Sequence, residues 1–268
     1  MALDSTAPPG PGDVETLDLV TGLLELLLPS ACAACGAGVE GDAALCRHCD
    51  AALPRLPRNL CLRCQSATPT GPGNLCRACA SATSPLAACV AAVAFADDVE
   101  GWIRRFKYPR KGIAGLDPAP GAVARALVRE AGGRCPGPPP ALIVPVPLHP
   151  RRLRARGFNP AARLARALAR DMAVRMDPVA LQRVRDTPSQ TGLERRERQR
   201  NVRGAFRARD GLRLPARVWL VDDVVTTGST LAEAARALRR AGARTVVGVC
   251  AARTRAVISA GSGPPCRR

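Results

Sequence analysis

The stretch Val-Trp-Leu-Val-Asp-Asp-Val-Val-Thr-Thr-Gly-Ser-Thr, residues 218–230, decides the fold of this 268-residue chain. It begins as an apolar run of strand length that delivers two carboxylates, Asp222 and Asp223. A short turn rich in hydroxyl groups follows, and then a helical pattern begins. Open sheets of parallel strands bind ligands at the carboxyl ends of their strands. The stretch therefore predicts a strand, a ligand-binding turn and a helix of an α/β fold.

The turn has the composition of a phosphate-binding loop. It consists of Thr226, Thr227, Gly228, Ser229 and Thr230. Backbone N–H groups, hydroxyls and a helix N-terminus converge there, which suits a phosphate monoester. The chain contains neither G-x-x-x-x-G-K-[ST] nor a strand-linked G-x-G-x-x-G, so P-loop and Rossmann sites are excluded. The two preceding acids suit ribose hydroxyls or the waters of a bound Mg²⁺, and the alternative is that they only cap the turn.

Strand and helix patterns alternate on both sides of this turn. The expected strands are 86–95, 141–147, 217–223 and 244–252. The expected helices are one capped by Asp98 that runs through Phe106, one over 161–170 opened by Asn159 and Pro160, and one over 230–241 closed by Gly242. Strand–helix–strand order predicts a parallel sheet flanked by helices, with right-handed crossovers.

Eight of the twelve cysteines form four C-x-x-C pairs within fewer than fifty residues. They are Cys32, Cys35, Cys46, Cys49, Cys61, Cys64, Cys76 and Cys79. Two such pairs complete a tetrahedral Cys₄ zinc site, so the segment predicts two structural zinc ions. Consecutive pairing is the simplest arrangement, while spacing leaves a crossed pairing open. An iron–sulfur site or a redox dithiol is the alternative. Cys89 and Cys250 have no such partner and are expected to be small buried strand residues.

The chain is strongly basic, with 40 Lys and Arg against 22 Asp and Glu and a formal net charge of +18. Such an excess favours polyanionic partners such as nucleic acid, phosphates or acidic membrane. Only Lys107 and Lys111 are lysines, and the dominance of Ala and Arg is typical of a GC-rich genome. Composition alone therefore leaves anion binding and sequence bias as equal alternatives.

Neither a membrane span nor a signal peptide is evident. The longest apolar stretch near the N-terminus is interrupted by Asp18 and Glu25, and a bilayer requires about 20 largely apolar residues. The first charged residues are acidic rather than basic, unlike those of a signal peptide. We therefore expect a cytoplasmic protein, in which cysteines favour metal over disulfides.

Several segments together resemble the competence-protein ComF (GntX-like) family. Residues 218–230 resemble the phosphoribosyl-pyrophosphate (PRPP) motif of type I phosphoribosyltransferases. The other similar segments are LLELLLPSACAAC (23–35), RRFKYPRKG (104–112), IVPVPLHPRRLRARGFN (143–159) and RDTPSQTGLERRERQRNVRGAF (185–206). Pro160 departs from the family, which usually has Gln after Arg-Gly-Phe-Asn. The resemblance covers about residues 13–252.

The resemblance implies a type I phosphoribosyltransferase-like domain with an N-terminal double zinc ribbon. The implied regions are a disordered 1–12, an N-terminal helix and double ribbon over 13–82, a transferase-like domain over 86–254 and a loose tail over 255–268. Residues 186–203 resemble a mobile lid over the active site. The acceptor base is expected in a hood around residues 86–116 and the zinc module.

The resemblance also implies roles for single residues. Asp222 and Asp223 would hold the ribose 2′ and 3′ hydroxyls of PRPP bound with Mg²⁺, and residues 226–230 its 5′-phosphate. The loop after strand 141–147, with Val146 and Pro147, would meet the pyrophosphate, for which Arg156 is a further candidate ligand.

Three functions fit the sequence. The first is a phosphoribosyltransferase that acts on an unidentified acceptor. The second is a PRPP-responsive regulator without turnover. The third is an accessory protein of DNA uptake that handles single-stranded DNA or contacts the competence machinery. The chain has only seven Phe, Trp and Tyr residues, which disfavours recognition of single strands by base stacking.

Overall fold

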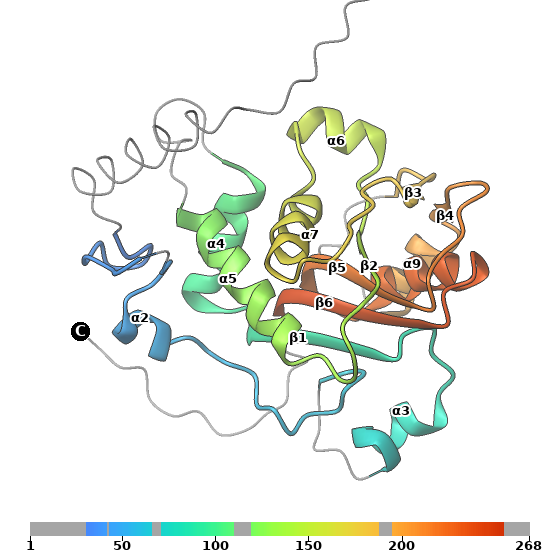
Figure 1. Ribbon diagram of the computed structural model, residues 1–268, viewed down its shortest axis with the longest axis horizontal. Helices are drawn as coiled ribbons and strands as arrows, with labels where there is room; N and C mark the ends of the chain where they lie inside the picture. Colours follow the sequence, from blue (N-terminus) through green and yellow to red (C-terminus); the bar gives the residue numbers. More distant parts are fainter. Residues whose placement is uncertain (1–30, 42, 66–70, 110–118, 188–194, 255–268) are drawn as a thin grey trace, which may run out of the picture. The chain divides into compact units, whose positions relative to one another are not determined.

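The computed structural model describes residues 31–41, 43–65, 71–109, 119–187 and 195–254 (Figure 1). The expected N-terminal helix, the disordered start and the loose tail lie outside these ranges. The chain forms two compact units, Met1–Ala52 and Leu53–Arg268. The first cysteine tetrad belongs to the smaller unit and the second to the larger, so the two ribbons are described separately.

A four-stranded parallel sheet forms the centre of the larger unit (Figure 1). Its strands are β1 (Ala88–Ala94), β6 (Thr245–Arg253), β5 (Arg217–Val225) and β2 (Leu142–Pro145), in that spatial order. Pro145 of β2 lies beside Val221 of β5, and Asp222 lies beside Cys250 of β6. This register brings the carboxyl end of β2 next to the two acids. The predicted parallel α/β fold is confirmed.

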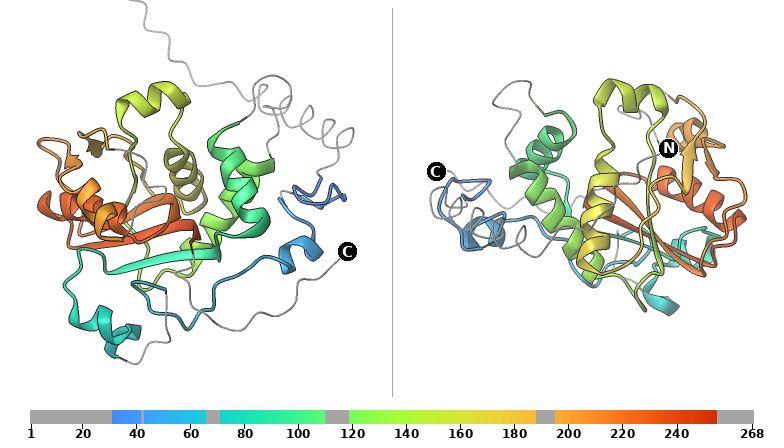
Figure 2. Two further views of the ribbon diagram at one scale, coloured as in Figure 1. Left: turned by 180° about the vertical axis from the view of Figure 1, so that it is seen from behind. Right: turned by 45° about the horizontal axis from the view of Figure 1, so that its top comes forward.

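Helices cover both faces of this sheet (Figure 2). α5 (Ala119–Gly133) and α7 (Pro160–Asp171) pack on one face, and α4 (Asp97–Lys107) packs on α5. α9 (Ser229–Arg240) lies on the other face. The Leu231 side chain of α9 contacts the sheet at Gly248, which pairs with Leu220 of β5. Gly132 of α5 contacts the sheet at Trp219, the residue before Leu220. Because adjacent residues of a strand point to opposite faces, the two helical layers sandwich the sheet.

Shorter elements complete the larger unit. They are η1 (Pro72–Asn74), α3 (Arg77–Ser81), α6 (Pro150–Arg156), α8 (Arg195–Val202) and the antiparallel pair β3 (Leu181–Arg183) and β4 (Phe206–Ala208). β3, β4 and α8 all pack against α9. The described part of the smaller unit contains α2 (Arg47–Ala51). Within the described ranges, no helix has the length and apolar character needed to cross a bilayer.

The core consists of small aliphatic side chains, as the low aromatic content requires. β1 and β2 are buried along their whole length, as expected of strands covered on both faces. Cys89 and Cys250 are fully buried within β1 and β6, which confirms their prediction as strand residues. α7 begins as predicted, since the Asn159 side chain accepts a hydrogen bond from the N–H of Ala161.

The structure corrects one local expectation and adds one helix that was not expected. Helix α4 begins at Asp97, directly after Ala96. Asp98 therefore lies in the first turn of this helix and does not cap it. The strand expected over 86–95 is confirmed as β1, which lies at the edge of the sheet. α5 was not expected, because Pro120 and the three glycines Gly121, Gly132 and Gly133 at its two ends weaken its helical pattern. Gly242 ends α9 in a left-handed conformation as predicted, with φ 105°.

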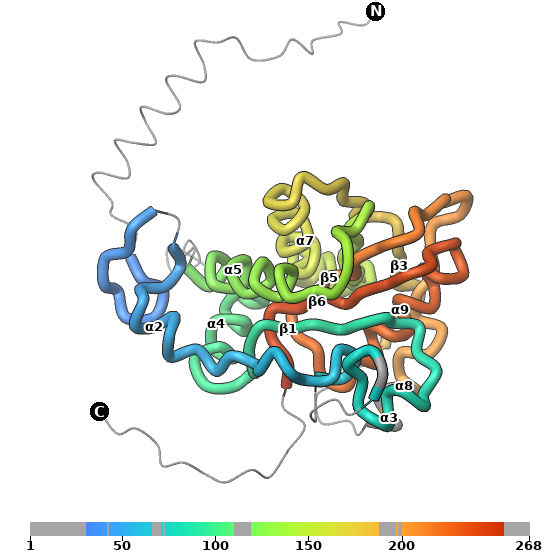
Figure 3. The backbone as a smooth tube through the Cα atoms, turned by 60° about the horizontal axis from the view of Figure 1, so that its bottom comes forward, coloured from blue at the N-terminus to red at the C-terminus, as the bar shows by residue number. Residues whose placement is uncertain are grey.

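The second ribbon is joined to the free edge of β1 (Figure 3). The N–H of Cys89 donates to the carbonyl of Leu62, and the N–H of Leu56 donates to the carbonyl of Ala92. The Gln65 side chain donates to the carbonyl of Ala91 and accepts from its N–H, at 3.2 and 2.9 Å. An exposed strand edge is a site of aggregation unless it is covered. Residues 53–65 therefore cover the sheet edge, and the second metal site holds part of that cover in place.

We expect the two cysteine tetrads to differ in their effect on the stability of the sheet. Cys64→Ser with Cys76→Ser should release the hydrogen bonds of Leu62 and Gln65 to β1, because the ribbon that orders them needs its metal. Three lost hydrogen bonds correspond to about 3 kcal/mol, or roughly 6–12 °C in the melting temperature.

The matched control is Cys35→Ser with Cys46→Ser in the first tetrad, which should leave the melting of the helical circular-dichroism signal almost unchanged. Equal effects of the two pairs would show that the ribbons act on the sheet as one unit.

Candidate functional site

The two acids lie at the carboxyl end of β5, the strand that runs between β2 and β6. The Asp222 carboxylate accepts a hydrogen bond from the N–H of Asp223, and the Asp223 carboxylate accepts one from the N–H of Val224, at 2.9 and 2.7 Å. These bonds hold both side chains against the end of the strand. Asp223 is buried and Asp222 is half-buried.

A lysine neutralises one of these carboxylates. The Lys107 Nζ atom lies 2.8 Å from the Asp223 Oδ1 atom, and the Lys107 side chain is only 24% exposed. Lys107 is the last residue of α4, whose Val99, Trp102, Ile103 and Phe106 are buried. Burial of that apolar face fixes the direction in which the end of the helix points. The sequence marked Lys107 only as one of two lysines, and that rarity was the available signal.

The other acid, Asp222, loses its proton less readily than an ordinary aspartate. Burial and then the charge of Asp223 raise the pKa of Asp222 from 3.8 to about 7. Lys107, the N–H of Asp223 and Arg183 oppose this rise but do not cancel it. Near neutral pH the pair therefore carries between one and two negative charges, and a cation bound there favours the doubly charged form.

The predicted phosphate turn connects β5 to α9. Gly228 has φ 76°, a left-handed conformation that glycine adopts without strain, and it precedes the first residue of α9. The Thr227 Oγ1 atom lies 2.8 Å from the Ser229 Oγ atom. The turn thus presents hydroxyls beside the N-terminus of a twelve-residue helix, where an anion is favoured by the helix dipole.

A cavity of about 200 Å³ lies over the two acids. Six of the predicted site residues line it: Val146, Pro147, Arg156, Asp222, Asp223 and Thr230. The other predicted turn residues, Thr226, Thr227, Gly228 and Ser229, do not line this cavity. Four cations, Lys107, Arg152, Arg156 and Arg183, face the two carboxylates. The lining therefore combines acceptors for hydroxyl groups with an excess of positive charge.

Arg183 was missed by the sequence analysis. It belongs to β3, is only 8% exposed, and donates to the Thr187 Oγ1 atom. Burial and then the charge of Arg152 lower its pKa. Its Nε atom is buried and lacks a hydrogen-bond partner among the described residues. A buried guanidinium with a spare donor at a cavity wall is suited to an anionic ligand.

The cavity mouth is held by side chains from three helices. The Asn159 amide donates to the carbonyl of Val146 while its oxygen caps α7, so one residue fixes the loop after β2. Arg156 stacks on the ring of Tyr108, 4.5 Å from its centroid, and donates to its hydroxyl at 2.7 Å. This pair connects the end of α6 to the residue after α4. Of the expected lid, 186–203, residues 188–194 lie outside the described ranges and residues 195–202 form α8.

The eight cysteines form two tetrads with consecutive pairing. Cys32, Cys35, Cys46 and Cys49 form one set, and Cys61, Cys64, Cys76 and Cys79 form the other. In each set the sulfur atoms lie within 4.8 Å of one another, so crossed pairing is excluded. Sulfurs at the corners of a zinc tetrahedron, each about 2.3 Å from the metal, lie about 3.8 Å apart. Cys35 and Cys46 have their sulfurs 3.8 Å apart, and Cys64 and Cys76 have theirs 3.7 Å apart. Both tetrads fit tetrahedral zinc.

Backbone N–H groups favour the thiolate form in both tetrads. Burial raises the pKa of Cys32, but backbone N–H groups, first that of Cys46 and then that of Cys35, lower it to about 6 overall. Cys61 shows the same balance, with the N–H groups of Cys76 and Cys64, and its pKa is also about 6. Thiolates are the form that binds zinc. In each tetrad the first cysteine therefore receives the same kind of support from backbone N–H groups.

Comparison with protein families identifies both parts of the chain. Residues 23–80 match the double zinc ribbon domain, and residues 154–258 match the phosphoribosyl transferase domain. The chain carries a double zinc ribbon and a phosphoribosyltransferase domain. The matched residues 154–258 contain β5, the acids and the turn, and the two matched domains are those that the resemblance to the ComF family implies.

Related proteins share up to half of the chain. DNA utilization protein YhgH of Salmonella typhi is 45% identical over 139 residues, which cover 50% of this chain and 60% of that protein. YhgH of Escherichia coli K12 is 45% identical over 118 residues, covering 43% and 50%. Competence protein F of Haemophilus influenzae is 41% identical over 105 residues, covering 38% and 46%. The chain thus spans about half the length of the relatives it matches.

We expect two zinc ions per chain of purified protein, measured by elemental analysis, because each tetrad supplies four thiolates at zinc spacing. The paired serine variants of either tetrad should each retain one zinc. Iron in place of zinc, or a single metal at full occupancy in the unaltered protein, would contradict this assignment.

We also expect Asp222→Asn and Asp223→Asn to change stability in opposite directions. The folded-state pKa of Asp222 is raised to about 7. Folding therefore binds a proton between about pH 4 and pH 7, and the free energy of unfolding falls as pH rises through that window. Asp222→Asn removes this dependence on pH. The free energy of unfolding of the variant should therefore equal that of the unaltered protein at pH 4 and exceed it by about 1–3 kcal/mol at pH 8, allowing for solvent screening.

Asp223→Asn should instead lower stability by about 1–3 kcal/mol at pH 8, because it leaves the half-buried Lys107 without its carboxylate. Denaturant unfolding in Mg²⁺-free buffer at several pH values measures both differences. Destabilisation by both variants at pH 8 would assign the two acids to capping of the turn.

Proposed function

We propose that this chain binds PRPP together with Mg²⁺ and transfers its phosphoribosyl group to a nitrogen nucleophile. The observation that carries the proposal is the position of two adjacent acids at the end of β5, directly before a hydroxyl-rich turn and a helix N-terminus. In the proposal, Asp222 and Asp223 bind the ribose hydroxyls and the turn binds the 5′-phosphate. The pyrophosphate lies near Val146, Pro147 and Arg156.

The proposed reaction needs positioning more than covalent chemistry. The bond between C1 and the pyrophosphate oxygen breaks, and pyrophosphate leaves with the electron pair. A bond from C1 to the acceptor nitrogen forms, and that nitrogen loses its proton to solvent. C1 passes through an oxocarbenium-like state that needs no protein nucleophile, in agreement with a chain that has only two histidines. Bound Mg²⁺ supplies charge neutralisation of the leaving group.

The cations around the cavity support the same proposal. Arg152, Arg156 and Arg183 supply positive charge toward a polyphosphate, while Lys107 already contacts Asp223. The Lys107 ammonium has three donors, of which Asp223 uses one, so it can also contact a hydroxyl or phosphate oxygen bound beside the acids. A ligand with both hydroxyl and phosphate groups matches this lining better than a simple anion, because the carboxylates repel an anion.

The names of the relatives concern DNA utilization and competence, and we extend that link to this chain as part of the proposal. Single-stranded DNA or the competence machinery is then a partner, beside the small-molecule ligand. The net charge of +18 supports attraction to a nucleic acid.

The test compares a variant in which both acids are replaced with a control variant in which two other adjacent aspartates are replaced. Asp222→Asn with Asp223→Asn should weaken PRPP binding in Mg²⁺ by tenfold or more, since each lost charge-assisted hydrogen bond is worth about 1.5–3 kcal/mol. Asp97→Asn with Asp98→Asn is the control, because it makes the same change at two adjacent exposed aspartates. Calorimetry measures the affinity, and release of pyrophosphate with a panel of bases measures turnover.

Equal PRPP affinities of the two variants would contradict the assignment of the acids. Saturable PRPP binding by the unaltered protein, without pyrophosphate release with any base, would identify a PRPP-responsive regulator in place of an enzyme.

A further inference from the structure

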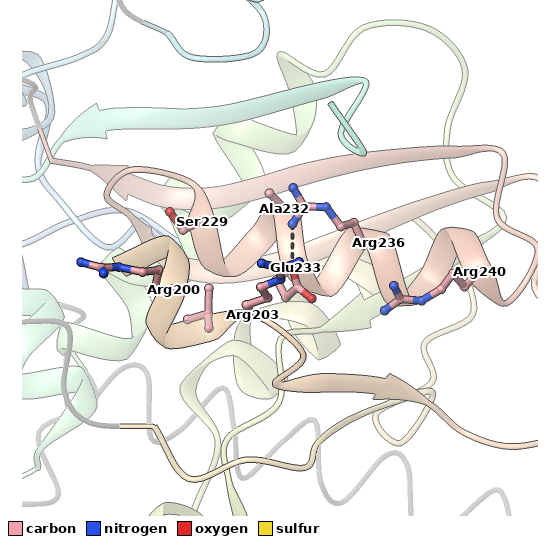
Figure 4. A pocket seen from close by; sticks show the side chains of 8 residues that line it. Arg200, Arg203, Ser229, Ala232, Glu233, Arg236 and Arg240 are labelled. Atoms are coloured by element: carbon pink, nitrogen blue, oxygen red, sulfur yellow. Dashed lines mark hydrogen bonds and ion pairs between the residues drawn. The ribbon is translucent and has the colours of Figure 1, made fainter. Parts of the chain in front are cut away.

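A second, larger cavity borders the phosphate turn (Figure 4). It is an open groove of about 930 Å³ between α9 and the segment formed by α8 and the residues after it. Its lining residues are Arg200, Val202, Arg203, Ser229, Ala232, Glu233, Arg236 and Arg240. Ser229 lines this groove, whereas the next residue, Thr230, lines the cavity over the acids. The turn thus separates two cavities with different linings.

The groove is strongly positive. Among the described lining residues the one carboxylate is that of Glu233, which is 6% exposed, accepts from the N–H of Gly204 at 2.9 Å and pairs with Arg236 at 2.6 Å. Arg200, Arg203 and Arg240 are exposed, and none of them has a carboxylate partner among the residues that the structure describes. Figure 4 shows these side chains along α9 and the facing segment. Three guanidinium groups are therefore left for an external anion.

The spacing of these groups suits a chain of phosphates. α9 extends for about 17 Å between Ser229 and Arg240, at 1.5 Å per residue. Each strand of a stacked B-form helix carries a charge about every 3.4 Å of its axis, so this length corresponds to at most roughly five phosphates of one strand. Arg236 and Arg240 lie one helical turn apart on one wall, while Arg200 and Arg203 stand on the other. A strand between the walls meets cations on both sides.

The lining also distinguishes between classes of partner. Docked protein segments usually insert apolar or aromatic anchors into pockets. Here Val202 is only 1% exposed, and the remaining apolar residue is the small Ala232. The part of the chain that the structure describes contributes no aromatic ring to the groove, so these residues offer no platform for base stacking. The arginine side chains of the groove therefore favour contact with phosphate groups over contact with bases or with apolar protein side chains.

We infer that this groove binds the phosphodiester backbone of a single-stranded nucleic acid, without preference for sequence. The cations stand on two walls of one groove, an arrangement that suits a single strand whose backbone follows the groove. The site goes beyond the proposed phosphoribosyl transfer, because it uses neither the two acids nor the cations over them. It gives the proposed DNA link a location that can be tested separately.

The experiment measures binding of a fluorescent twenty-residue oligothymidylate to the full-length protein by anisotropy at several salt concentrations. Arg200→Ala with Arg203→Ala and Arg240→Ala should weaken binding by about 30-fold or more at low salt. The slope of log K against log salt should fall by about 2, since each lost phosphate contact on a single strand contributes about 0.7.

The control variant, Arg154→Ala with Arg166→Ala and Arg213→Ala, removes the same charge from exposed arginines elsewhere and should change the affinity by less than threefold. Equal losses in the two triple variants would overturn the inference, because they would reflect only the net charge. Displacement of the strand by polyglutamate at equal charge concentration would assign the groove to an acidic protein. Tighter binding of a duplex of the same length would overturn the single-strand assignment.

The variant Asp222→Asn with Asp223→Asn separates this inference from the proposed function. It should bind the oligothymidylate normally, whether or not it binds PRPP. Loss of strand binding in that variant would place the strand over the acids and overturn the groove assignment. The groove variant, in turn, should keep the melting temperature of the unaltered protein, since all three of its arginines are exposed.

Discussion

Two adjacent carboxylates at the end of a buried parallel strand impose a requirement that the larger unit is built to meet. Asp222 and Asp223 lose solvation and repel each other, so one of them needs a cation at close range. Lys107 provides it at 2.8 Å. Lys107 can reach Asp223 because α4 packs on α5, and α5 in turn packs on β1 and β6. The helical layer that contains α4 and α5 thus contacts the two acids through the ion pair between Lys107 and Asp223.

The features that the sequence predicted are those with short-range signals. The run of apolar residues in β5, the Asn159 cap of α7 and the C-x-x-C spacing each depend on neighbours within a few positions. Their bounds in the structure differ from the predicted ones by only a few residues. The type of each element follows from local sterics and hydrogen bonding, which are encoded within each segment.

The features that the sequence missed arise between segments far apart in the chain. Lys107 meets Asp223 across more than a hundred residues, and Gln65 meets Ala91 across 26. No local pattern encodes such contacts. Arg183 was hidden for a different reason, because arginine is so frequent here that identity alone says little. Lysine is rare in this chain, and so Lys107 and Lys111 were the two cations whose identity carried information.

The turn from β5 to α9 explains how one short segment can serve two ligand chemistries. On the side of Thr230 the lining contains carboxylates, which accept hydrogen bonds from hydroxyl groups and require a cation. On the side of Ser229 the one carboxylate among the described lining residues is already paired with Arg236, so the groups that these residues leave for a ligand are cations. A sugar phosphate suits the first side and a bare phosphate chain the second. Ser229 and Thr230 are consecutive, so the start of α9 contributes one hydroxyl residue to each cavity and marks the boundary between the two linings.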